Sequence, residues 1–120
     1  MQKINKLEIE IIRFAKKLNS TNLSPLRSGN ISTRAEKNNV GGFLITPSGI
    51  KYETLKPNEI VFVSLDGNYD EKGLAPSSEW RFHQDIYLNK KRAKAIVHAH
   101  SPYATAVSAL GKPIPAFHYM

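Results

Sequence analysis

The sequence predicts one small domain that mixes helices and strands in an α/β sandwich, and three observations favour this class. Apolar residues recur at helical spacing near the N-terminus, and short β-branched runs alternate with turn-forming residues further along the chain. The 120 residues, of which 41% are hydrophobic, suffice for one core. No apolar run approaches the roughly 20 residues that span a bilayer. The order of the strands cannot be read from this pattern.

The first half of the chain alternates helix, loop and strand signals. Residues 3–18 predict an amphipathic helix, because apolar side chains recur every three or four positions. Residues 19–30 are polar and rich in turn formers, which indicates a loop. The runs "GGFLIT" (41–46) and "EIVFVSL" (59–65) predict strands, and "DGNYDEKG" (66–73) predicts a hairpin turn or loop.

The second half begins with a helix signal and ends with another. We expect a helix over residues 79–89, with Ser77 or Ser78 as its N-cap. Residues 94–100 predict a buried strand, and a helix from Pro102 to about Leu110 should follow it.

Charge and cysteine content narrow the partners and the compartment. The net charge of +7 suggests anionic partners. The basic residues are scattered, apart from residues 89–94, and no helix-turn-helix, zinc finger or aromatic-plus-basic platform is present, so we expect no nucleic acid. The absence of cysteine fits a reducing cytoplasm. Glu8 and Glu10 within the first apolar pattern argue against a signal or transit peptide, so we expect a cytoplasmic protein without membrane contact.

Two histidines one residue apart, His98 and His100, end the last predicted strand in "KAIVHAHSPYATAV". Side chains at i and i+2 of a strand share a face, so both imidazoles should project to one side. Either they are metal ligands, or one is exposed and the other is a hydrogen-bonded core residue. Zinc usually takes three or four protein ligands. Without cysteine, another ligand has to come from His83, His118, Glu79, another carboxylate or a different chain.

Serine and glycine turns offer a second kind of site. In "PSSEWRFHQDIY" (76–87), Ser77 and Ser78 supply hydroxyls and exposed backbone N–H groups at a helix start, where anions bind readily. Glu79 follows them as a candidate general base or metal ligand, although serine and an acidic residue also begin many ordinary helices. The short turns "SGNIS" (28–32) and "TPSG" (46–49) allow close backbone approach to a phosphate, but most such turns only reverse the chain.

Taken in order, the segments "SGN", "TPSG", "PSSEWRFH" and "HAHS", followed by "IPAFHYM", resemble the class II aldolase/adducin family, and within it the branch of the L-fuculose-phosphate aldolases. The resemblance covers nearly the whole chain. It implies a three-layer α/β/α sandwich with a largely antiparallel central sheet. It also implies that residues 1–120 are the N-terminal part of a single domain, truncated relative to the family, with the C-terminal half absent.

The resemblance further implies a role for each motif. His98 and His100 would be ligands of one zinc ion per subunit, and Glu79 would be the acid/base, which also approaches the metal when no substrate is bound. His83 and His118 match positions that are not ligands in the family and are expected to be structural. The substrate phosphate would be held by Gly29, Asn30, Ser48, Gly49, Ser77 and Ser78.

The implied reaction is the reversible cleavage of a ketose 1-phosphate to dihydroxyacetone phosphate and an aldehyde, with zinc polarising the carbonyl and stabilising the enediolate. The family's third zinc histidine and a catalytic tyrosine match positions beyond Met120, so the resemblance does not imply activity of residues 1–120 alone. The family also implies a homotetramer. Two alternatives are an adducin-like, non-catalytic interaction module, and a pentulose-phosphate 4-epimerase or thiosugar-phosphate dehydratase of the same family.

Overall fold

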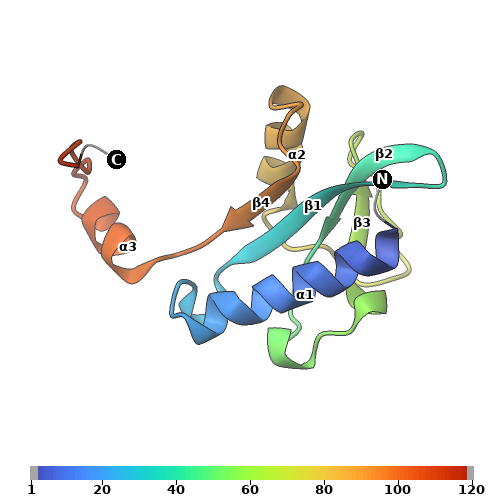
Figure 1. Ribbon diagram of the computed structural model, residues 1–120, viewed down its shortest axis with the longest axis horizontal. Coiled ribbons are helices and arrows are strands. Elements are labelled where there is room, and N and C mark those ends of the chain that lie inside the picture. The colour runs from blue at the N-terminus through green and yellow to red at the C-terminus, as the bar shows by residue number, and fades with distance from the viewer. Residues whose placement is uncertain (1–2, 119–120) are drawn as a thin grey trace.

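The structure is a computed structural model, and it describes residues 3–118. Three short 3-10 turns accompany its helices and strands, at Pro25–Arg27, Tyr52–Thr54 and Pro57–Glu59. In chain order the longer elements are α1 (Ile4–Ser20), β1 (Asn30–Lys37), β2 (Val40–Ile45), β3 (Val61–Ser64), α2 (Trp80–Asn89), β4 (Ala95–His98) and α3 (Pro102–Ala109). Figure 1 shows α3 and residues 110–118 extending away from the rest of the molecule. Within the described residues, no helix combines the length and the apolar character needed to cross a membrane.

The four strands form one sheet in the order β3-β2-β1-β4, and every neighbouring pair is antiparallel. A tight turn at Asn38 and Asn39 joins β1 to β2, and both residues have positive φ angles, of 51° and 63°. Asparagine tolerates this left-handed conformation, which matches the twist of a short hairpin. At the other side of β1, the register pairs Asn30 with His98.

The sheet separates two hydrophobic clusters, because side chains alternate between its faces. On the first face α1 covers β1 and β2. On the second face Tyr87 of α2 joins the β2 and β3 side chains. The α1 cluster contains Leu7, Ile11, Ile12, Ala15, Leu18, Ile31, Ala35, Leu44, Tyr52, Leu55 and Ile60. The second cluster contains Phe43, Ile45, Val61, Val63 and Tyr87. The predicted three-layer sandwich with an antiparallel sheet is therefore confirmed.

One strand was not predicted. β1 occupies residues 30–37, and the expected loop at 19–30 is shorter at both ends, since α1 continues to Ser20 and Asn30 already belongs to β1. Only one face of β1 carries apolar side chains. Its other face carries Ser32, which is fully buried and whose hydroxyl is hydrogen-bonded to His83 and Tyr87 of α2. Because Ser32 is polar and Thr33 stands between Ile31 and Ala35, the segment shows neither an apolar run nor a regular apolar alternation.

Two further expectations are wrong. The strand predicted as buried is the edge strand β4, and its Val97 side chain is 60% exposed, because only β1 lies beside it in the described sheet. The N-cap of α2 is Glu79 rather than Ser77 or Ser78. The Ser77 hydroxyl instead accepts a hydrogen bond from the backbone N–H of Glu79, at 3.4 Å, one turn before the helix.

Candidate functional site

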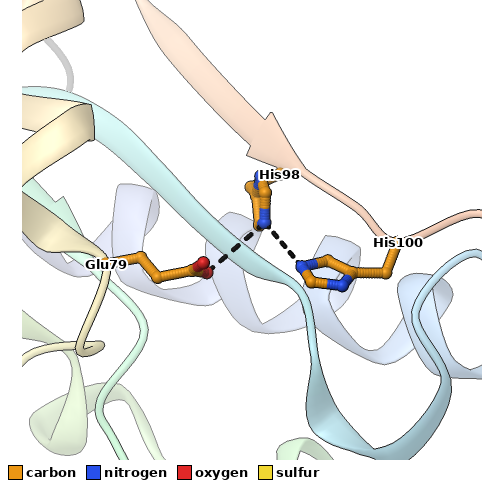
Figure 2. A group of neighbouring side chains, drawn as sticks. All are labelled: Glu79, His98 and His100. Atoms are coloured by element: carbon orange, nitrogen blue, oxygen red, sulfur yellow. Dashed lines mark hydrogen bonds and ion pairs between the residues drawn. The ribbon is translucent and has the colours of Figure 1, made fainter. Parts of the chain in front are cut away.

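Three side chains that lie apart in the sequence converge where β4 ends and α2 begins (Figure 2). The Nε2 atoms of His98 and His100 are 2.8 Å apart, and His98 Nε2 lies 3.4 Å from Glu79 Oε2. One potential ligand atom from each residue lies within 4.8 Å of the other two. The side chains of His98 and Glu79 are 27% and 37% exposed, so a small ion could reach them from solvent.

The sheet and its loops position the two histidines. His98 is the last residue of β4, and its ring meets the edge of the Phe82 ring of α2, with centroids 4.9 Å apart. His100 lies past the strand end, where its backbone N–H donates to the Ser24 hydroxyl at 3.4 Å. The strand pairing places His98 beside Asn30, whose side chain reaches Glu79. The expectation that both imidazoles share one side therefore agrees with the geometry.

The donor set suits a divalent metal. Two imidazole nitrogens and a carboxylate oxygen are the common zinc ligands when no thiolate is available. Among the described residues, no other group of three or more histidine, aspartate and glutamate side chains has this geometry. His83 and His118, which the sequence left open as ligands, are not members of the group.

A pocket of about 260 Å³ adjoins this group. Glu79 and His100 line it, and so do Ser28, Pro47, Ile50 and Tyr52. The remaining lining residues are the six candidates for phosphate binding: Gly29, Asn30, Ser48, Gly49, Ser77 and Ser78. Three segments far apart in the sequence thus meet around one cavity, directly beside the possible metal ligands.

Backbone hydrogen bonds hold the two serine-containing turns together. An isolated bridge pairs Pro47 with Pro76. The N–H of Ser48 donates to the Ala75 carbonyl, and the N–H of Ser77 donates to the Thr46 carbonyl, both at 3.0 Å. The expectation of exposed N–H groups at both serines before α2 is therefore wrong for Ser77. Its hydroxyl remains as the group that a ligand in the pocket can use.

Gly29 and Gly49, the two glycines predicted to bind phosphate, require glycine for different structural reasons. A Cβ on Gly29 would lie 2.2 Å from the Ser24 hydroxyl and 2.7 Å from the His98 carbonyl oxygen, so this position needs glycine for packing. Gly49 has a φ angle of +78° and open space around it, so it needs glycine for its backbone conformation. Of the two, only Gly49 has open space on the side where a Cβ would lie.

Sequence reasoning missed Tyr52, which is buried next to the pocket. Its hydroxyl donates a hydrogen bond to the Gly29 carbonyl and fixes the turn before β1. Burial raises the pKa of Tyr52, so the phenol stays protonated and remains a donor. A lone tyrosine in "GIKYETL" gives no sequence signal for this contact.

Fold and site together define an α/β/α protein whose antiparallel sheet presents a candidate metal group beside a polar pocket. The family model described as "Class II Aldolase and Adducin N-terminal domain" matches residues 9–120, and the chain belongs to this family. The resemblance seen in the motifs is therefore confirmed.

Relatives and solved structures agree with this assignment. The chain is 44% identical over 110 residues to a 5-methylthioribulose-1-phosphate/5-deoxyribulose-1-phosphate aldolase of Rhodospirillum rubrum, covering 92% of this chain and 48% of that protein. It is 45% identical over 116 residues to an L-fuculose phosphate aldolase of Escherichia coli, covering 97% of this chain and 52% of that protein. A solved L-fuculose 1-phosphate aldolase superposes with a TM-score of 0.83 at 38% identity, covering 95% and 53%. The chain spans about half the length of these relatives.

Proposed function

We propose that this chain contains the metal and phosphate sites of a zinc-dependent sugar-phosphate aldolase, which reversibly cleaves a ketose 1-phosphate to dihydroxyacetone phosphate and an aldehyde. One observation supports this above the others. A carboxylate and two imidazoles converge at the edge of a pocket lined by serine side chains and glycine turns. The names of the similar proteins agree with a phosphorylated sugar as the substrate.

In this proposal, His98 and His100 hold one zinc ion per subunit, together with a ligand from outside residues 1–120, and Glu79 also approaches the ion while no substrate is bound. The Nε2 atoms of both histidines face the Glu79 carboxylate, which is the donor arrangement such an ion requires. When bound, zinc supplies a Lewis acid that polarises the substrate carbonyl.

Glu79 accepts and returns the proton that moves during cleavage. Glu79 lines the pocket and is the N-cap residue of α2, so its carboxylate lies within reach of a substrate in the cavity. The Asn30 side-chain N–H donates to Oε2 at 2.6 Å and restricts the carboxylate to one orientation. A base that is held in place does not have to be ordered during the reaction.

The substrate phosphate occupies the pocket. We propose that it contacts Gly29, Asn30, Ser48, Gly49, Ser77 and Ser78, all of which line the cavity. Hydroxyl and amide donors suit phosphate oxygens, and the net charge of +7 favours an anion. Binding energy from the phosphate would position the reacting carbons without acting on the bond that breaks.

The remaining parts of the proposal concern the whole protein. Residues 1–120 would be the N-terminal part of a single domain, since the matched relatives are about twice as long. The complete protein would be a cytoplasmic homotetramer that binds neither nucleic acid nor membrane.

The test uses the purified chain, loaded with zinc and mixed with L-fuculose 1-phosphate or 5-methylthioribulose 1-phosphate. Release of dihydroxyacetone phosphate is measured, and its loss in Glu79→Gln and His98→Ala supports the proposal. Glu71→Gln is the matched control, because Glu71 lies exposed in a loop outside the pocket. A chain that holds no zinc by elemental analysis and releases no product overturns the proposal.

A non-catalytic, adducin-like interaction module is the second candidate. The exposure of β4 and α3 favours it, since no described residue from 94 to 118 is buried and such a surface suits a protein partner. Cleavage that depends on His98 would exclude this candidate. Product analysis would also separate an aldolase from an epimerase, which isomerises its substrate, and from a dehydratase, which releases water.

A further inference from the structure

A chain of hydrogen-bonded side chains crosses the core on the α2 side of the sheet and ends at Glu79. Tyr87 OH lies 2.8 Å from Ser32 Oγ, and Ser32 Oγ lies 2.7 Å from His83 Nδ1. His83 Nε2 contacts Asn30 Oδ1, and Asn30 Nδ2 lies 2.6 Å from Glu79 Oε2. The first four of these residues are at most 3% exposed, and the fifth is the candidate acid/base.

The direction of every bond follows from the carboxylate end. An ionised Glu79 only accepts, so Asn30 donates through Nδ2 and presents Oδ1 to His83. That oxygen also only accepts, so His83 Nε2 has to donate. In a neutral imidazole Nδ1 is then the acceptor, and the Ser32 hydroxyl has to donate to it.

The last bond is fixed in the same way. Ser32 uses its single proton on His83, so its oxygen accepts from the Tyr87 hydroxyl. Tyr87, Ser32, His83 and Asn30 therefore each donate one bond towards Glu79, which only accepts. Burial lowers the pKa of His83 to about 4, which keeps the ring neutral at physiological pH.

We propose that His83, oriented by Ser32 and Tyr87, is a positioning residue that locks the Asn30 amide so that it donates to Glu79. Without this lock, rotation of the amide by half a turn would place Oδ1 against the carboxylate, and the two oxygens would repel each other. The bonded atom is also the one that matters for the metal group, because Oε2 is the Glu79 oxygen 3.4 Å from His98 Nε2.

A purely structural role explains this arrangement less well. His83 is fully buried, and an apolar residue in its place would avoid the cost of burying a ring with two polar atoms. Every bond in the chain is satisfied only in the one direction that delivers an N–H to Glu79. The inference deepens the proposed function, because it rests on the role given there to Glu79.

The first test is spectroscopic and needs neither metal nor substrate. A ¹H–¹⁵N spectrum that resolves the imidazole nitrogens should show His83 with its proton on Nε2 and a bare Nδ1. A proton on Nδ1 would reverse the first bonds of the chain and overturn the proposal. Because this measurement involves no zinc, it tests the direction of the hydrogen bonds even if the proposed function fails.

The second test measures the dissociation constant for Zn²⁺ by titration calorimetry. Ser32→Ala removes the donor to His83, and the constant should rise about tenfold, the lower range for groups that orient metal ligands. Ser64→Ala is the matched control, a buried serine of the same sheet whose hydroxyl accepts from Asn68 N–H, outside the chain of bonds. It should leave the constant within about twofold of the wild type.

Tyr87→Phe provides a variant that keeps the ring in the core and removes only the terminal donor. It should shift the zinc dissociation constant in the same direction as Ser32→Ala, by a smaller factor. Equal constants for Ser32→Ala, Tyr87→Phe and Ser64→Ala would overturn the proposal. A wild-type chain that binds no Zn²⁺ would instead contradict the proposed function. The imidazole spectrum would then be the test of the hydrogen-bond direction at His83.

Discussion

Two regions of this molecule differ sharply in how they are held. The body comprises residues 3–93, with α1, the strands β1 to β3, and α2, and it contains every buried hydrophobic residue of the described chain, from Leu7 to Tyr87. The arm comprises residues 94–118, with β4 and α3, and none of its described residues is buried. Figure 1 shows the arm leaving the sheet at β4 and leading away from both layers.

The difference shows where the candidate site obtains its geometry. Glu79 belongs to the body, while His98 and His100 belong to the arm, so the site forms only where the two regions meet. Four register pairs with β1, from Asn30↔His98 to Thr33↔Ala95, attach the arm to the body. A metal ion held by the three residues would therefore be a cross-link between a packed region and an exposed one.

The largest effect should separate the regions by stability. Phe43 is fully buried in the body, and Phe43→Ala should lower the free energy of unfolding by about 3–5 kcal/mol. Phe117 of the arm is 79% exposed, and Phe117→Ala is the same chemical change with an expected effect within about 0.5 kcal/mol. Urea denaturation measures both. Comparable losses would mean that the arm packs as firmly as the body.

The second effect is stabilisation by zinc, whose proposed ligands come from both the body and the arm. At a Zn²⁺ concentration of about 100 times the dissociation constant, binding should raise the free energy of unfolding by about 2.7 kcal/mol. Amide hydrogen exchange in β4 should slow at the same time, and EDTA should reverse both changes. His98→Ala removes one ligand, so equal stabilisation of that variant by zinc would place the ion elsewhere.

The third effect is a decrease in the free energy of unfolding at acid pH, caused by His83 in the body. Burial lowers the pKa of His83 from 6.5 to about 4, so between these values the unfolded chain binds a proton that the folded chain does not. Above pH 6.5 neither state binds this proton, and the free energy of unfolding is at its full value. As the pH falls from 6.5 towards about 4, the proton stabilises the unfolded chain and the free energy of unfolding decreases. Over that window the wild type should lose about 2 kcal/mol more than His83→Gln.

Denaturant titrations at several pH values in that window measure this difference. Parallel curves for the wild type and His83→Gln would show that His83 is not the source of the loss of stability in acid. The measurement uses metal-free protein, because bound zinc would itself change the free energy of unfolding.

The smallest effect compares two glycines around the pocket. Gly49→Ala places a side chain at a positive φ angle in open space and should cost about 1–2 kcal/mol of stability, with no change in zinc affinity. Gly29→Ala would push against the His98 carbonyl, so it should weaken zinc binding as well. Calorimetric titration of both variants measures this contrast. Equal zinc affinities would show that the contact at Gly29 does not position His98.

The sequence predicted most elements because their patterns are local. The helical spacing of α1, the apolar runs of β2 and β3, and the proline at the start of α3 report structure directly. His98 and His100 share one side as expected, although His100 lies past the end of β4, where the two-residue repeat of a strand no longer sets its direction. The segments around the pocket were identified by resemblance, and the structure brings them to one cavity.

What the sequence did not reveal depends on partners far along the chain. β1 was missed because Ser32 is buried through bonds to residues more than 50 positions away. β4 was expected to be buried because its composition is apolar, and composition does not show how many strands lie beside it. His83 was expected to be structural, and no pattern around it indicates the bond that it makes to Asn30.

The edge of β4 has a consequence for anyone who handles this protein in solution. Along that strand, one row of backbone N–H and C=O groups faces away from β1 and pairs with no strand in residues 3–118. With Val97 exposed beside it, such an edge is a template on which strands of other molecules can assemble. Self-association should therefore increase with concentration, and a lysine at position 97 should suppress it, because a charge on an edge strand opposes sheet extension.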